Sequence, residues 1–169
     1  DYVIVATGSK PISLPNMEID EENILSSKGA LNLEEIPDSL LVIGGGYIGL
    51  EMAFIYSSLG SKVTIVELLD SLIPNMDTDL QDVAEQMMKR KRVKIYTESK
   101  VTSLEDGDKI KAKIEGDTEK EIEVDKVLLS VGRKPTPPET ELDIIGDNNE
   151  IVTDDIMKTK FNDLYAIGD

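Results

Sequence analysis

The chain has 169 residues, of which 18 are basic and 34 acidic, and its formal net charge is −16. This balance argues against nucleic acids and anionic membranes as partners, because both require clustered Lys and Arg, and it favours a protein dissolved in the cytoplasm. Cys and His are both absent, which excludes disulfides, thiol nucleophiles, imidazole acid–base groups and the metal ligands that they provide, so no metal site is predicted.

The first half of the chain predicts a βαβ unit. The runs at residues 2–7 and 40–43 are continuous and apolar, as in strands that are buried on both faces. A helical period covers residues 47–59 and ends at Gly60, a residue type that favours the left-handed position after a helix. A further strand at 62–66 follows, and parallel strands require such a crossover. The expected buried stripe of the helix is Ile48, Met52, Ile55 and Leu59.

The second half changes from a helical period to an alternating one. A helix over 77–91 is expected to bury Leu80, Val83, Ala84, Met87 and Met88, and Thr78 and Gln81 have the spacing of a capping box. Three runs after the next strand alternate apolar and polar residues, with turn dipeptides between them: 101–105, 109–115 and 121–124. They predict a three-stranded antiparallel meander, after which a buried strand returns at 126–131.

A glycine motif, G-x-G-x-x-G, follows the strand at 40–43 and consists of Gly44, Gly46 and Gly49. The first glycine permits a tight turn, the second lets a pyrophosphate approach the backbone, and the third lets the helix pack on the sheet. A strand–helix turn without a ligand is the alternative, but the surrounding strand–helix–strand order favours dinucleotide binding. We therefore predict an α/β, Rossmann-like βαβ dinucleotide-binding domain with a parallel sheet and the inserted antiparallel β-meander.

Glu67 ends the second strand of the βαβ unit, about 20 residues beyond the glycines, where an acid accepts hydrogen bonds from the ribose hydroxyls of a dinucleotide. A solvated acid at a strand end is the alternative. The residues that follow, Leu68 to Asp70, include no Arg or Lys to pair with a 2′-phosphate. NAD is therefore the predicted cofactor in preference to NADP.

Four segments in this order resemble the pyridine nucleotide–disulfide oxidoreductases: ATGSKP at 6–11, GGGYIGLE at 44–51, SVGRKP at 130–135 and YAIGD at 165–169. The resemblance covers essentially the whole chain and is greatest to the dihydrolipoamide dehydrogenases. It implies an FAD domain interrupted by an NAD domain. Residues 1–12 would end the first FAD segment, 13–135 would form the NAD domain, and 136–169 would start the second FAD segment. One departure is Arg92, where the family often has Gly.

The resemblance also implies roles for individual residues. The expected NAD contacts are Gly44, Gly45, Gly46, Tyr47, Ile48, Gly49, Glu51, Glu67, Val101 and Gly132. Among them, Glu51 would lie near the nicotinamide ribose, Val101 at the adenine and Gly132 at the nicotinamide. Part of an FAD site would be formed by Thr7, Gly8, Ser9 and Asp169. Tyr47 would cover the flavin until nicotinamide displaces it, and an aromatic packed at a helix start is the alternative.

The resemblance implies an activity that belongs to a longer parent enzyme and not to this chain alone. The parent would be a homodimeric FAD flavoprotein that transfers hydride to NAD while it oxidises dihydrolipoamide, with lipoamide or a lipoyl domain as partner. Its Cys pair and His–Glu pair would lie outside these residues, so the chain is expected to be an inactive, monomeric fragment with no catalytic residue. The alternatives are the NAD domain of an NADH oxidase or peroxidase, a coenzyme A disulfide reductase or a mercuric reductase, and a free-standing NAD-binding sensor.

Overall fold

The computed structural model describes residues 1–117 and 119–169. They form two compact units, Ser13–Val131 and the pair of segments Asp1–Ile12 and Gly132–Asp169. Throughout the described residues, every helix is too short or too polar to pass through a bilayer.

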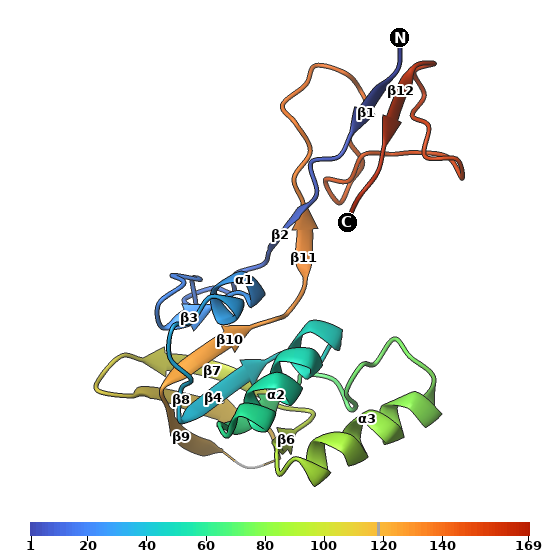
Figure 1. Ribbon diagram of the computed structural model, residues 1–169. Helices are drawn as coiled ribbons and strands as arrows, with labels where there is room; N and C mark the ends of the chain where they lie inside the picture. Colours follow the sequence, from blue (N-terminus) through green and yellow to red (C-terminus); the bar gives the residue numbers. More distant parts are fainter. Residues whose placement is uncertain (118) are drawn as a thin grey trace. The chain divides into compact units, whose positions relative to one another are not determined.

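A five-stranded parallel sheet is the centre of the Ser13–Val131 unit (Figure 1). Its strands have the order β3-β10-β4-β5-β6, and their bounds are β3 Ile24–Leu25, β4 Ser39–Ile43, β5 Lys62–Val66, β6 Lys94–Tyr96 and β10 Lys126–Leu129. Buried residues of β4 alternate between two hydrophobic clusters, because successive side chains of a strand point to opposite faces. Leu40 and Val42 belong to one cluster, and Leu41 and Ile43 to the other. The prediction that residues 40–43 form a strand buried on both faces is confirmed.

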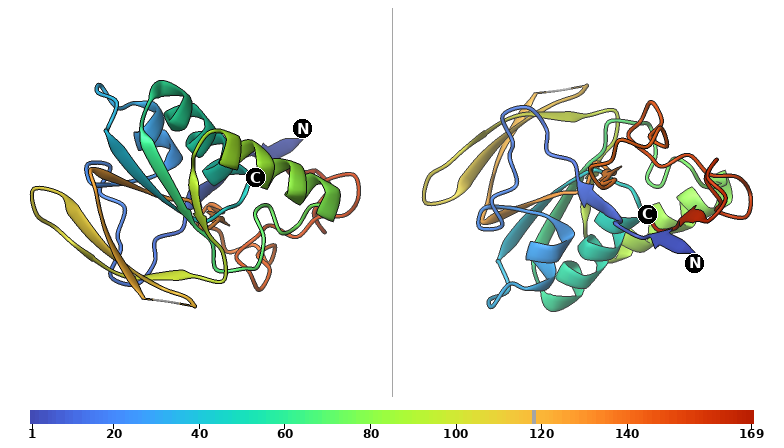
Figure 2. Two further views of the ribbon diagram at one scale, coloured as in Figure 1. Left: turned by 90° about the horizontal axis from the view of Figure 1, so that it is seen from below. Right: turned by 90° about the horizontal axis from the view of Figure 1, so that it is seen from above.

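Helices cover one face of this sheet and a β-meander covers the other (Figure 2). The helices are α1 Ser27–Leu31, α2 Tyr47–Leu59 and α3 Thr78–Arg90, and the meander strands are β7 Lys100–Glu105, β8 Ile110–Glu115 and β9 Lys120–Val124. Adjacent meander strands are antiparallel. The predicted fold class is therefore confirmed, with the meander inserted between β6 and β10.

The buried face of α2 differs from the predicted stripe. The structure buries Gly49, Met52, Ala53 and Tyr56, whereas Ile55 and Leu59 are 39% and 53% exposed. The helix approaches the sheet through its small residues, so its orientation follows Gly49 and Ala53 rather than the larger apolar side chains. At its end, Gly60 has φ 105°, as predicted.

Helix α3 also buries less than predicted. Ala84 and Met88 are buried, but Leu80, Val83 and Met87 are 51%, 61% and 38% exposed. The capping box is not formed, because the N-cap residue is Asp77. The Gln81 side chain instead donates a hydrogen bond to the Met76 carbonyl at 2.8 Å.

The second unit contains two short strand pairs. β1 (Val3–Val5) runs parallel to β12 (Leu164–Ala166), and β2 (Ser9–Pro11) runs antiparallel to β11 (Arg133–Pro135). The prediction that the first strand is buried was wrong. Val3 and Ile4 are 56% and 62% exposed, because β1 belongs to a two-stranded sheet rather than to a covered central one. Because β11 pairs with β2, the boundary between the two compact units lies after Val131. The sequence placed the domain boundary after Pro135.

Candidate functional site

The glycine loop leaves β4 and enters α2, and its three motif glycines meet different surroundings. A Cβ at Gly44, which has φ 102°, would lie 2.5 Å from the Ser130 carbonyl oxygen. A Cβ at Gly49 would lie 2.1 Å from the Gly44 oxygen. A Cβ at Gly46 would meet no atom of the described residues within 4 Å. Gly44 and Gly49 are thus required by the fold, whereas the space over Gly46 is open to a ligand.

The start of α2 lies at this open space. Gly46 is the N-cap residue, with extended backbone at φ −69° and ψ −179°, and within the described chain no side chain caps it. The first intrahelical hydrogen bond runs from the Leu50 N–H to the Gly46 carbonyl at 2.9 Å. Uncapped N–H groups and the positive end of the helix dipole suit an anionic group such as a pyrophosphate.

Glu67 follows β5 directly, and its side chain turns back to the glycine loop. Its Oε2 accepts a hydrogen bond from the Gly45 N–H at 2.5 Å, and its Oε1 accepts one from the Leu69 N–H at 2.8 Å. Glu67 is 8% exposed, which rules out the alternative of a solvated acid at a strand end. Backbone N–H groups offset the desolvation of its charge.

Two supports of the loop were missed by sequence reasoning. The Ser130 hydroxyl lies 3.0 Å from the carbonyl oxygens of both Ile43 and Gly44. The Ile73 N–H donates to the Gly45 carbonyl at 2.9 Å. Ser130 follows β10, the sheet neighbour of β4, and parallel strands bring their carboxyl ends to one edge. That rule was available for Ser130, whereas Ile73 lies in an irregular segment for which the sequence has no comparable pattern.

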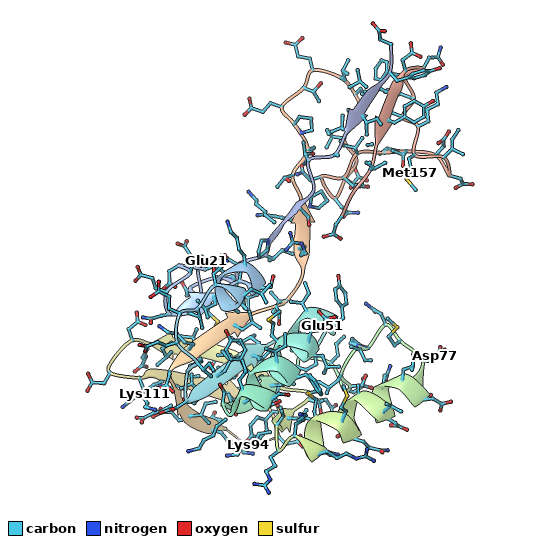
Figure 3. All side chains as sticks on the ribbon, viewed as in Figure 1. Glu21, Glu51, Asp77, Lys94, Lys111 and Met157 are labelled. Atoms are coloured by element: carbon cyan, nitrogen blue, oxygen red, sulfur yellow. The ribbon has the colours of Figure 1, made fainter. Side chains whose placement is uncertain are left out.

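The remaining predicted NAD contacts are dispersed. Tyr47 begins α2 and is 62% exposed, and Glu51 lies on the same helix with its side chain exposed (Figure 3). Val101 is 8% exposed and packs in the hydrophobic cluster on the meander side, so it offers little surface to an adenine ring. Gly132 begins a segment of the other unit, with φ 124°. The roles of these four residues stay predictions.

The second unit brings together the predicted FAD-side residues from the two ends of the chain. The Ser9 hydroxyl donates to the Asp169 carboxylate at 2.6 Å. The Arg133 Nε lies 2.7 Å from the Ser9 hydroxyl and 3.0 Å from the Asp169 carboxylate. The hydrogen bond from Ser9, and then the Arg133 guanidinium, hold the pKa of Asp169 below its ordinary value. Arg133, in the GRKP segment, was not among the predicted site residues.

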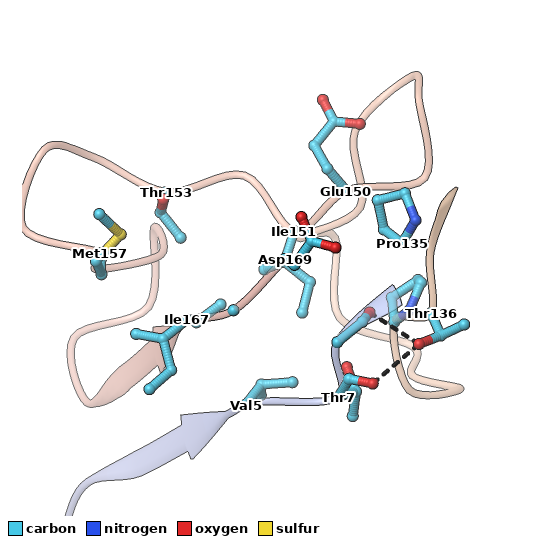
Figure 4. A pocket seen from close by; sticks show the side chains of 14 residues that line it. Val5, Thr7, Pro135, Thr136, Glu150, Ile151, Thr153, Met157, Ile167 and Asp169 are labelled. Atoms are coloured by element: carbon cyan, nitrogen blue, oxygen red, sulfur yellow. Dashed lines mark hydrogen bonds between the residues drawn. The ribbon is translucent and has the colours of Figure 1, made fainter. Parts of the chain in front are cut away.

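A cavity of about 170 Å³ lies in this unit, lined by Thr7, Gly8 and Asp169 among others (Figure 4). Thr136 also lines the cavity, and its hydroxyl lies 2.9 Å and 2.8 Å from the carbonyl oxygens of Thr7 and Gly8. Pockets for whole small ligands measure roughly 300–1,000 Å³. The cavity therefore has room for part of a dinucleotide and not for all of one.

Comparison with known proteins gives a match to the family model "Pyridine nucleotide-disulphide oxidoreductase" over residues 1–169. Curated relatives include a leghemoglobin reductase of Glycine max, 40% identical over 99% of this chain and 34% of its own length. A mitochondrial dihydrolipoyl dehydrogenase of Arabidopsis thaliana is 39% identical over 99% of this chain and 35% of its own length. A dihydrolipoyl dehydrogenase of Haloarcula marismortui is 36% identical over 100% and 37%.

Solved structures show the same fold. LpdA of Mycobacterium tuberculosis superposes with a TM-score of 0.87 at 28% identity, over 98% of this chain and 37% of that one. RclA of Escherichia coli, a flavoprotein disulfide reductase, gives 0.83 at 27% identity, over 99% and 39%. The chain thus spans a little over a third of the length of these relatives.

Proposed function

Because the chain belongs to the pyridine nucleotide-disulphide oxidoreductase family, whose enzymes depend on FAD and NAD(P), we propose that its Ser13–Val131 unit binds NAD(H). The observation that carries the proposal is the contrast among the glycines. Gly44 and Gly49 are closed in by backbone atoms, whereas the space beside Gly46 is open among the described residues at the uncapped start of α2.

In the proposed complex, the pyrophosphate lies over Gly46 and accepts hydrogen bonds from the first N–H groups of α2. The adenosine ribose extends towards Glu67. Each Glu67 oxygen already accepts one backbone N–H, and a carboxylate oxygen has a second lone pair for a hydroxyl donor. The arrangement therefore provides for both halves of an ADP group, at adjacent strand ends of the sheet.

We propose that the other unit supplies part of an FAD site through Thr7, Gly8, Ser9 and Asp169. The cavity lined by Thr7, Gly8 and Asp169 supports this assignment, as do the hydrogen bonds that join Ser9 to Asp169 and Arg133. In the parent enzyme, bound flavin would exchange hydride with the nicotinamide, and this chain's residues would bind and orient the two dinucleotides. The sequence assigned residues 13–135 to the NAD domain and residues 1–12 and 136–169 to the FAD side. We propose the same order of domains with the second boundary between Val131 and Gly132, because Arg133 is hydrogen-bonded to Ser9 and Asp169.

The parent enzyme is proposed to oxidise dihydrolipoamide, because dihydrolipoyl dehydrogenases recur among the relatives. A thiol step would need residues beyond these 169, which contain neither Cys nor His. The chain alone should therefore show no NADH:lipoamide turnover. It should retain no flavin, because it supplies only part of an FAD site, and we expect it to sediment as a monomer. The cytoplasm remains the proposed compartment, although some relatives are mitochondrial.

Amide chemical-shift mapping with NADH tests the location of the site. We expect the largest shifts at Gly44–Gly49 and at Leu69, the N–H groups that surround the proposed pyrophosphate and ribose. Amides of the other unit, such as Thr7–Ser9, serve as the internal control. Shifts confined to Thr7–Ser9, or no shifts at saturating NADH, would contradict the assignment of NAD to the Ser13–Val131 unit.

A further inference from the structure

We propose that Glu67 is a positioning residue of the glycine loop as well as a candidate ribose ligand. Its carboxylate holds the loop in its binding conformation through the Gly45 N–H before any dinucleotide arrives. The inference rests on the proposed NAD site and assigns a second task to one of its residues. It also assigns a structural role to Gly45, the glycine between the first two motif positions.

The segment after β5 holds Gly45 on both of its backbone polar groups. The N–H of Gly45 donates to Glu67 Oε2 at 2.5 Å, and its carbonyl accepts from the Ile73 N–H at 2.9 Å. The contact is also tight, because a Cβ at Gly45 would lie 2.6 Å from Leu72 Cδ2 and 3.2 Å from Glu67 Cβ. Residues 67–73 thus fix the middle of the glycine loop.

The Glu67 carboxylate is itself held in place. Its second oxygen accepts the Leu69 N–H at 2.8 Å, and the residue is 8% exposed. A carboxylate fixed at both oxygens and shielded from water makes stronger hydrogen bonds than a solvated one. Glu67 therefore has the geometry of a rigid link between the end of β5 and the loop after β4.

Backbone strain supports the inference that residues 67–73 hold the glycine loop. Ile73, whose N–H reaches Gly45, has φ 44°, a left-handed conformation that is rare for β-branched residues. Such strain persists where the surroundings determine it, and it is common in segments that hold a ligand site. The strained residue and the buried carboxylate both act on Gly45.

The link has a consequence for cofactor choice. The Glu67 charge disfavours a 2′-phosphate, and the same carboxylate accepts the Gly45 N–H. Removing the whole carboxylate, as in Glu67→Ala, therefore removes the charge and also releases the loop. Glu67→Gln separates the two effects, because the amide keeps one acceptor oxygen and loses the charge. Glu67→Asp keeps the charge on a side chain that is one methylene shorter and cannot reach Gly45 from the same backbone position.

Amide hydrogen exchange on the ligand-free chain tests the link directly. Loss of a hydrogen bond to a charged group corresponds to about 10- to 100-fold, so Glu67→Ala should accelerate Gly45 N–H exchange by that factor. Glu67→Gln should give an intermediate rate, and Glu67→Asp a rate near that of the Ala variant. Glu98→Gln is the matched control, because Glu98 is an exposed acid after the neighbouring strand β6, and it should leave Gly45 unchanged.

Amides of β4 report on the fold in the same spectra, and their exchange should stay at the wild-type rate in Glu67→Gln. Unchanged Gly45 exchange in both Glu67→Ala and Glu67→Gln would overturn the link. Titration with NADH keeps this result separate from the proposed function. A Gly45 rate that depends on Glu67 without NADH binding would retain the link and refute the NAD site. NADH binding with a Gly45 exchange rate that is independent of Glu67 would retain the NAD site and refute the link.

Discussion

The Gly45 N–H and the Glu67 carboxylate are joined by a hydrogen bond of 2.5 Å, although the two residues lie 22 positions apart in the chain. This bond connects the loop after β4 to the end of β5, the two elements that would hold the pyrophosphate and the ribose of a dinucleotide. The candidate site is therefore one connected structure and not two separate motifs.

Cofactor choice should depend on Glu67. Two like charges at about 4 Å repel by about 4 kcal/mol at an effective dielectric of 20, and solvent and salt reduce this to about 2–3 kcal/mol. We predict that the wild type prefers NADH to NADPH by about 30- to 200-fold. Glu67→Ala should weaken NADH binding and narrow the ratio, without creating strong NADPH binding, because it supplies no cation.

Calorimetric titration of both cofactors into wild type and Glu67→Ala measures this preference. Glu98→Ala, which removes an exposed acid after β6, should keep the wild-type ratio. Equal wild-type affinity for NADH and NADPH would mean that the 2′-position of the bound ribose lies away from Glu67.

The motif glycines should differ in their effect on stability. In Gly49→Ala the new Cβ would lie 2.1 Å from the Gly44 oxygen, and overpacking of this kind costs about 1–3 kcal/mol or more. Gly46→Ala places its Cβ in space that is open among the described residues and should cost less than about 1 kcal/mol. Urea unfolding of the two variants compares them, and equal loss would show that the loop is not packed as described.

Arg92 should be a site where glycine stabilises the chain. It follows α3 with φ 60°, a conformation that costs non-glycine residues about 1–2 kcal/mol, so Arg92→Gly should raise the free energy of unfolding by about 0.5–1 kcal/mol after the added freedom of the unfolded chain is counted. Gln86→Gly, at an exposed position in the interior of α3, is the control and should lower stability by about 1 kcal/mol. Thermal unfolding distinguishes the two signs, and destabilisation by both would refute the left-handed assignment of Arg92.

Acid stability should depend on Asp125, which links the start of β4 to the meander. Its carboxylate accepts the Ser39 hydroxyl at 2.6 Å and the Lys109 ammonium at 2.9 Å. The Ser39 hydrogen bond, and then the one from Lys109, hold the pKa of Asp125 below its ordinary value of 3.8. The stabilisation is therefore complete above the unfolded-state pKa and is lost as the pH falls through the lower folded-state pKa.

The Asp125→Asn variant should be less stable than wild type near neutral pH, and the difference should shrink as the pH falls below about 4. Urea unfolding at a series of pH values measures this convergence. Asp108→Asn changes an exposed acid between β7 and β8. Its free energy of unfolding should follow the wild-type dependence on pH. A constant difference between Asp125→Asn and wild type at every pH would exclude the carboxylate charge as the source.

Sequence reasoning predicted the fold well where local pattern and packing agree. A continuous apolar run predicted β4, and β5 was predicted as the next strand after the helix. Alternation predicted the meander, and Gly60 predicted the end of α2. It predicted the burial of Met52 in α2 and of Ala84 and Met88 in α3, but it also placed larger exposed side chains inward. Residue size does not show that α2 approaches the sheet through Gly49 and Ala53. It also predicted a buried first strand, since an apolar run does not reveal how many neighbours a strand has.

The candidate site was predicted in part. The roles of Gly44 in the turn and of Gly49 in helix packing follow from the motif, and the structure supplies the steric contacts. The hydrogen bonds of Glu67 and Ile73 to the loop could not be derived, because they depend on how an irregular segment folds back after β5. The position of Ser130 could have been inferred from the parallel strand order but was missed. The ligand roles of all these residues remain predictions.

Calorimetric titration of NADH into the wild-type chain and Gly46→Val tests the central claim most directly. Gly46 has extended backbone that a valine can adopt, and its Cβ would enter space that is open among the described residues, so the variant should remain folded. We predict saturable binding of one NADH by the wild type and none by Gly46→Val, because a branched side chain would occupy the place of the pyrophosphate. Equal NADH affinity of the two folded proteins would contradict the claim that the glycine loop is the binding site.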